Sequence, residues 1–150
     1  MTKPQTQFFV TLGILIVILG VAGLTFTMHN QGRAQVFTAT IHPNCAPWDG
    51  AAFTVSIPMS AGSVIDISIW KSPDIKVPVT FSFPDNTGQV GNASYRSASD
   101  KYEPLNGTVF FPSVEAGSQV EGRFELITEA GQQFKGQFEA QWSDVVMMCG

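Results

Sequence analysis

The sequence is poor in charge, in cysteine and in histidine. Charged residues make up 13% of the 150, about half the share found in an ordinary soluble domain. Lys3 and Arg33 are the only charged residues among the first 34, so the rest of the chain holds 6 basic and 12 acidic residues, a net charge of −6. Such an acidic chain offers no basic face to nucleic acid and no polybasic cluster to anionic lipid. We therefore expect no nucleic-acid partner.

Charge is absent altogether from residues 8–26, where only Thr11 and Thr25 carry polar side chains. A helix of this length spans roughly 28 Å, close to the thickness of the hydrocarbon core of a bilayer. Since backbone groups in lipid must satisfy their own hydrogen bonds, the segment predicts a transmembrane helix. It is either a permanent anchor or a secretory signal cleaved after Ala34.

This segment sets the expected domain organisation and location. Residues 1–7 form a short cytoplasmic tail, residues 8–26 the membrane helix, residues 27–40 a linker with the first strand, and residues 41–150 an extracytoplasmic β domain. We expect a single-pass protein of the cell membrane whose domain faces the extracytoplasmic side. The domain is secreted if cleavage occurs.

Cys45 and Cys149 are the only cysteines, and they enclose nearly the whole predicted domain. Outside the cytoplasm, two cysteines predict one disulfide, here closing a loop of roughly 100 residues. The competing hypothesis is a zinc site with His29 and His42. It is disfavoured because no pair has the short spacing typical of zinc ligands, and Pro43 makes the stretch after His42 extended. We expect no metal and no cofactor.

The chain after residue 35 alternates like β-strands and is interrupted by turns. Three sets of apolar residues recur at every second position, which is typical of strands with one buried face: Phe53, Val55 and Ile57; Ile65, Ile67 and Ile69; Val77, Val79, Phe81 and Phe83. No helical period is present. The sequence predicts an all-β domain, either an antiparallel β-sandwich or a small up-and-down barrel.

A 14-residue repeat gives the most specific structural prediction. Residues 115–126 and 129–140 are identical at seven of twelve aligned positions. A three-residue loop at 129–131, with Gly131 in the left-handed conformation, predicts a hairpin with every apolar side chain on one face. Leu126 then faces Phe134, Phe124 faces Gly136, and Gly122 faces Phe138, so that each glycine lies opposite a phenylalanine that covers it.

No catalytic constellation is present, so we do not expect an enzyme. His42 is the only histidine beyond residue 34, and no serine lies in a Gly-x-Ser-x-Gly elbow. Binding is more open, because large aromatic side chains can anchor a partner. The candidate surface comprises Trp48, Trp70, Tyr95 and Tyr102. Trp70 is expected to be exposed, and Trp142 to belong to the core.

Both tyrosines lie in residues 87–106, a weakly patterned stretch that predicts a long loop suited to recognition. The sequence also contains glycosylation sequons at Asn92 and Asn106, which are used only in a host that glycosylates exported chains.

Together these features predict a membrane-anchored, extracytoplasmic, non-catalytic β domain that binds or assembles with an envelope or membrane partner. One alternative is a small accessory subunit whose helix packs inside a larger membrane complex, since Gly13, Gly20 and Gly23 allow close helix approach. A more distant alternative is an envelope hydrolase that uses paired carboxylates.

Overall fold

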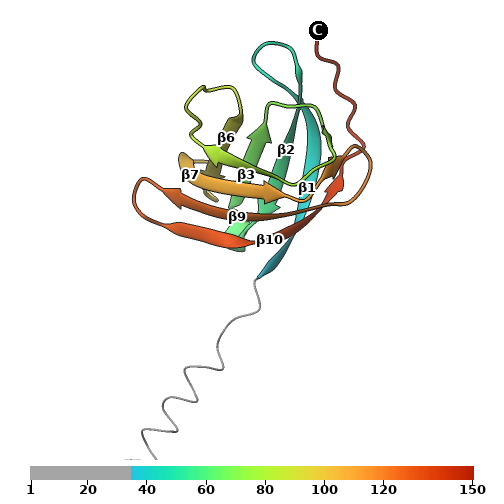
Figure 1. Cartoon of the computed structure of the whole chain (residues 1–150). Helices are drawn as coiled ribbons and strands as arrows, with labels where there is room; N and C mark the ends of the chain where they lie inside the picture. The colour runs from blue at the N-terminus through green and yellow to red at the C-terminus, as the bar shows by residue number, and fades with distance from the viewer. Residues whose placement is uncertain (1–34) are drawn as a thin grey trace, which may run out of the picture. The chain divides into compact units, whose positions relative to one another are not determined.

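The computed structural model describes residues 35–150 (Figure 1), and within this range it is all-β, as the sequence predicted. The strands are β1 (Val36–Cys45), β2 (Ala51–Pro58), β3 (Val64–Ile69), β4 (Asp74–Ile75), β5 (Val79–Phe83), β6 (Gly91–Arg96), β7 (Tyr102–Phe111), β8 (Val114–Glu115), β9 (Val120–Thr128) and β10 (Gln133–Trp142). A three-residue 3₁₀ turn, η1 (Ser60–Gly62), is the only helical element in these residues. None of their helices is long and apolar enough to cross a membrane. The predicted membrane segment, residues 8–26, lies outside the described range.

Seven of the strands close into a barrel, in the order β7-β6-β3-β2-β1-β10-β9 and back to β7. Strands β1 and β10 pair in parallel, from Val36 opposite Gln137 to Ile41 opposite Trp142, and the other pairs are antiparallel. Strand β5 pairs with residues 107–111 of β7, and the short β4–β8 pair forms a separate sheet. The expected sandwich is therefore wrong, because a single sheet closes on itself. The expected up-and-down alternative is right about the barrel but not about its strand directions.

Closure depends on β7, which is long enough to pair with different neighbours along its length. Residues 102–104 pair with β6, whereas residues 105–110 pair with β9. Gly107 lies in the second half, at φ 134°, where a Cβ atom would overlap the carbonyl oxygen of Glu125. Only glycine allows this close backbone approach.

The barrel interior is filled by the alternating residues that the sequence pattern identified. All members of the first two sets are completely buried, and Phe81 and Phe83 on β5 are nearly so. Val77 precedes β5 and is 67% exposed, so the third set extends one alternation too far. Aromatic rings dominate the centre, where Phe111 contacts three other rings edge-on: Phe53, Phe81 and Phe138.

The β9–β10 hairpin has the predicted register. Leu126 pairs with Phe134, Phe124 with Gly136, and Gly122 with Phe138. Gly131 has φ 87°, and its N–H donates to the carbonyl oxygen of Thr128 at 3.0 Å. The ring of Phe138 covers Gly122, as expected. At Gly136, however, the covering ring is Phe37 of β1 rather than Phe124.

The weakly patterned stretch at 87–106 is not the long loop expected from its composition. Its residues form β6 and the first half of β7, joined by a short turn at 97–101. The apolar alternation of β6 is hard to recognise in the sequence because its buried position is occupied by a small residue, Ala93. Gly91, at φ 142°, sits where a Cβ atom would overlap the carbonyl oxygen of Ser68.

Candidate functional site

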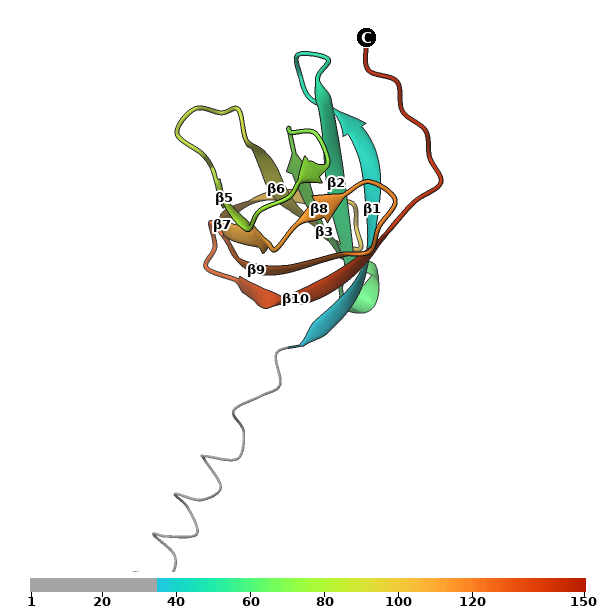
Figure 2. The same ribbon diagram turned by 45° about the vertical axis from the view of Figure 1, so that its right-hand side comes forward.

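Cys45 and Cys149 form a disulfide, as predicted from their number and context, with 5.6 Å between their Cα atoms. The bond ties Cys149 to the last residue of β1, and we call residues 143–150, which run as a coil beside the barrel, the C-terminal strap (Figure 2). Its first residue is tied by the Ser143 N–H, which donates to the carbonyl oxygen of Ile41 at 2.8 Å. Beyond that point the strap is in no strand, and its side chains Val146 and Met148 are 88% and 92% exposed.

The strap also brings His42 and Ser143 together, a contact that sequence reasoning missed because 101 residues separate them. His42 Nδ1 lies 2.9 Å from Ser143 Oγ, and both residues are partly buried. No carboxylate in residues 35–150 bonds to this histidine. The same residues contain no group of three or more His, Cys, Asp or Glu side chains placed to hold a metal ion.

Trp48 and Trp70 meet near the disulfide, and we call this part of the barrel the aromatic end. Trp48 lies in the β1–β2 turn, which is closed by the Ala46 N–H donating to the carbonyl oxygen of Gly50 at 2.8 Å. Trp70 follows β3 and continues its ladder, donating its N–H to Val90. The two rings pack edge to face with centroids 5.8 Å apart. Trp48 is 53% exposed, whereas Trp70, which was expected to be exposed, is half-buried. Trp48 is therefore the outer ring of the pair.

The two candidate tyrosines do not belong to this end and do not form a common surface. Tyr95 turns inward and stacks on Phe134, with centroids 5.0 Å apart. Tyr102 is 63% exposed, and the Arg96 guanidinium lies 6.0 Å from its ring centre. Trp142, assigned to the core, is half-buried: its ring contacts Phe53, and its Nε1–H donates to the carbonyl oxygen of Glu115 at 3.0 Å.

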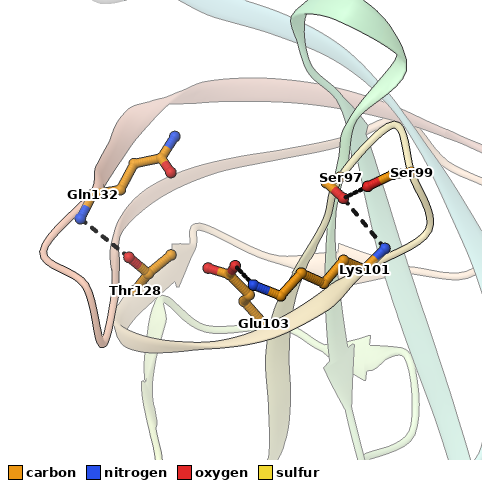
Figure 3. A network of polar contacts seen from close by, with 6 residues as sticks. All are labelled: Ser97, Ser99, Lys101, Glu103, Thr128 and Gln132. Atoms are coloured by element: carbon orange, nitrogen blue, oxygen red, sulfur yellow. Dashed lines mark hydrogen bonds and ion pairs between the residues drawn. The ribbon is translucent and has the colours of Figure 1, made fainter.

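Polar side chains near Tyr102 stabilise turns. Figure 3 shows the β6–β7 and β9–β10 turns, each closed by its own hydrogen bonds. Ser97 Oγ accepts from the Lys101 N–H at 3.2 Å, and Thr128 Oγ1 accepts from the Gln132 N–H at 3.1 Å. The Lys101 ammonium pairs with Glu103 at 3.0 Å. These groups, of which Thr128 is buried, have local structural roles, and among them no side chains converge on a ligand.

One carboxyl group has a shifted acidity. Asp85, in the turn after β5, accepts hydrogen bonds from the Thr87 hydroxyl and from the backbone N–H groups of Thr87 and Gln89. The hydroxyl bond makes the largest contribution to lowering the pKa of Asp85 below 3.8, because these donors stabilise the charged form. This turn belongs to the β5–β6 connection, whose last residue, Val90, accepts the Trp70 N–H at 2.9 Å.

Comparison with known proteins gives no relative for this arrangement. No protein-family model matches the sequence. No curated protein matches it either. No solved structure matches the fold. The aromatic end must therefore be interpreted from its own geometry.

Proposed function

We propose that this protein is a membrane-anchored, extracytoplasmic, non-catalytic domain that binds a partner protein of the cell envelope through its aromatic end. The observation that carries the proposal is Trp48, which is 53% exposed although it packs on a second tryptophan. A large aromatic side chain fixed by a neighbouring ring is the kind of residue that dominates the binding energy of protein interfaces.

The position of the aromatic end within the barrel suits a tethered binding domain. The chain enters β1 at one end of the barrel, and the C-terminal strap finishes at the other (Figure 1). Strand β1 joins the two ends, and its ten residues span roughly 33 Å at the usual rise per residue. Trp48 follows the end of β1, so within the domain it lies at the far end of this strand from Val36. Tethering also raises the effective concentration of the domain near membrane partners, so that weak contacts suffice.

The turn that carries Trp48 is held before any partner arrives. Two backbone hydrogen bonds close it, and the disulfide begins one residue before it. Gly50 lies directly under the indole, where a Cβ atom would come within 2.7 Å of Nε1 of Trp48. A side chain that is already ordered loses less conformational entropy on binding. The aromatic end thus resembles a preorganised contact rather than a mobile loop.

The location is tested by protease treatment of intact cells or spheroplasts. The proposal expects the β domain to be digested without lysis, and digestion only after lysis would refute it. N-terminal sequencing of the mature protein then distinguishes an anchor from a signal, because a terminus at Gln35 means secretion.

The binding role is tested by crosslinking and mild-detergent purification with three forms of the full chain. These are the unchanged chain, the double variant Trp48→Ala/Trp70→Ala, and the matched control Tyr102→Ala, which removes an exposed aromatic ring elsewhere. The proposal expects a stoichiometric partner that is lost only from the double variant. A partner lost instead on removal of residues 1–34 favours the accessory-subunit alternative. Turnover of a glycan or peptide by the purified chain would show that the non-catalytic assignment is wrong.

A further inference from the structure

Strand β5 is the one strand of the eight-stranded sheet, within residues 35–150, that has a single neighbour. It pairs along its whole length with residues 107–111 of β7, and its other edge pairs with no strand of the described range. The side chains of Thr80 and Ser82 are exposed, whereas Phe81 and Phe83 turn into the core. The free edge of β5 therefore lies at the surface, and the proposed function does not use it.

The alternation of hydrogen bonds shows which backbone groups this edge presents. The Thr128 N–H donates to the carbonyl oxygen of Gln132, so every second residue of β9, beginning with Thr128, bonds to β10, and the residues between them bond to β7. Carried across β7, the same alternation directs the odd-numbered residues of β5 toward β7. The N–H and C=O groups of Thr80 and Ser82 consequently point to the free edge. No strand or turn within residues 35–150 bonds to them.

Proline bounds this edge at both ends. Pro78 and Pro84 occupy the next positions that point to the free edge, and neither residue has an N–H. Between them the edge carries no charged side chain, although charge is a common protection of exposed edges against pairing. The edge is thus short and uncharged, and it is closed at both ends. These properties favour one limited pairing over open-ended aggregation.

We propose that this edge binds a second copy of this chain, through antiparallel pairing of β5 with β5 about a two-fold axis at Phe81. Thr80 of one copy then lies opposite Ser82 of the other, so the two N–H donors of each copy meet two carbonyl oxygens. Pro78 lies opposite Pro84, so no N–H is left without an acceptor at the ends of the pair. Because a two-fold pairing is closed, the assembly stops at a dimer.

The residues beside the edge also suit a second copy. The register places Lys76 of one copy one position from Asp85 of the other, and their opposite charges attract. Val77, which is 67% exposed in the single barrel, comes next to Pro84 of the second copy. No like charges face each other across the pair, because β5 itself is uncharged. The net charge of −6 on each domain opposes association, so the pairing strengthens as salt screens this repulsion.

The test is disulfide crosslinking of the purified full chain in detergent micelles, with the native disulfide intact. One sample mixes the variants Thr80→Cys and Ser82→Cys, and two further samples contain each variant alone. Directly opposite residues of a hydrogen-bonded pair have Cα atoms about 5.5 Å apart, within disulfide range, whereas diagonal neighbours are about 7–8 Å apart. The proposal expects a covalent dimer that forms several-fold faster in the mixture than in either variant alone. The control Gln137→Cys, an exposed position on a strand paired along both edges, measures random collision.

A proline variant supplies a second measurement. Thr80→Pro removes an N–H from the free edge and leaves the bonds between β5 and β7 in place. It lowers the association constant of the dimer, measured by light scattering, at least roughly tenfold, since the dimer loses two hydrogen bonds. The matched control Thr80→Val keeps the N–H and the dimer.

Three results would overturn the assignment. Equal crosslinking in the mixture, the single variants and the Gln137→Cys control would exclude the register. A dimer that persists in folded Thr80→Pro would be held by another part of the chain, such as the segment before residue 35. Absence of a dimer would exclude the second copy, and slow hydrogen exchange at Thr80 and Ser82 would then show that a different segment covers the edge.

Discussion

Removing the disulfide tests how the C-terminal strap is held. The change is the double variant Cys45→Ser/Cys149→Ser, which leaves no unpaired thiol, in a chain that begins at residue 35. The two cysteines are 104 residues apart. In the chain-entropy model, a crosslink of that span restricts the unfolded chain by about 4.7 kcal/mol at 25 °C.

The folded structure predicts a smaller measured effect. The parallel β1–β10 ladder already holds Trp142 beside Ile41, so in the folded barrel the disulfide closes only about 8 further residues, from Trp142 to Cys149. Without the bond, the strap gains conformational entropy in the folded state as well, since few other contacts hold its exposed residues. This gain offsets part of the entropy gained by the unfolded chain. The difference between the two loops, (3/2)RT ln(104/8) with the separation of 104, is about 2.3 kcal/mol. We therefore expect a loss of about 2 kcal/mol.

Urea unfolding followed by tryptophan fluorescence measures this loss under oxidising conditions. A chain that ends after Ser143 is the matched comparison, because it lacks both the strap and the crosslink, and it should lose a similar amount. A loss near 4.7 kcal/mol in the double variant would refute the reasoning, since it would mean that the strap stays ordered without the bond. No loss at all would refute the chain-entropy model for this barrel.

Other changes test separate parts of the structure. Gly107→Ala should lower the free energy of unfolding in urea by about 2–5 kcal/mol, because it adds an overlap with a backbone oxygen to the strain of a positive φ. Gly88 also has a positive φ but open space around it, so the control Gly88→Ala should lower the free energy of unfolding by only about 1 kcal/mol. Equal decreases in the two variants would contradict the overlap. Asp85→Asn should lower stability at pH 7 but not near pH 2. The pKa of Asp85 is lowered in the folded state, so its contribution to stability is present above pH 3.8 and disappears as the pH falls through the pKa of the folded state. A stability difference between the variant and the unchanged chain that persists in strong acid would contradict this. Trp142→Phe should cost about 1 kcal/mol through loss of the Nε1–H bond to Glu115, measured as a shift of the urea midpoint at constant slope.

The parts of the fold that follow from local alternation could be predicted from the sequence. The register of β9 and β10 is an example, because a three-residue loop is the connection that puts every apolar residue of the pair on one face, and a slip by one residue would expose them all. The disulfide also followed from residue number and context. Both depend on few residues and on rules that act within a strand or a pair.

What could not be predicted depends on contacts between distant segments. The closure of the sheet requires β7 to leave β6 and join β9, and the one sequence signal for it is Gly107, which any turn would explain equally well. Phe37 covers Gly136 only because β1 and β10 pair in parallel, a fact that alternation alone does not encode. The Trp48–Trp70 pair has the same origin: each ring is local to its turn, but their contact needs β2 and β3 to be in register.

The parallel pairing of β1 with β10 has a consequence for how the domain is made. One edge of the first barrel strand, β1, pairs with the last strand, β10, so Val36 and its partner Gln137 are about 100 residues apart in the sequence. Contacts of such long sequence separation are slow to form, and the barrel cannot close before β10 has been synthesised. Until then β1 has one unpaired edge, and the bond between Cys45 and Cys149 can form only once the barrel strands have all been made.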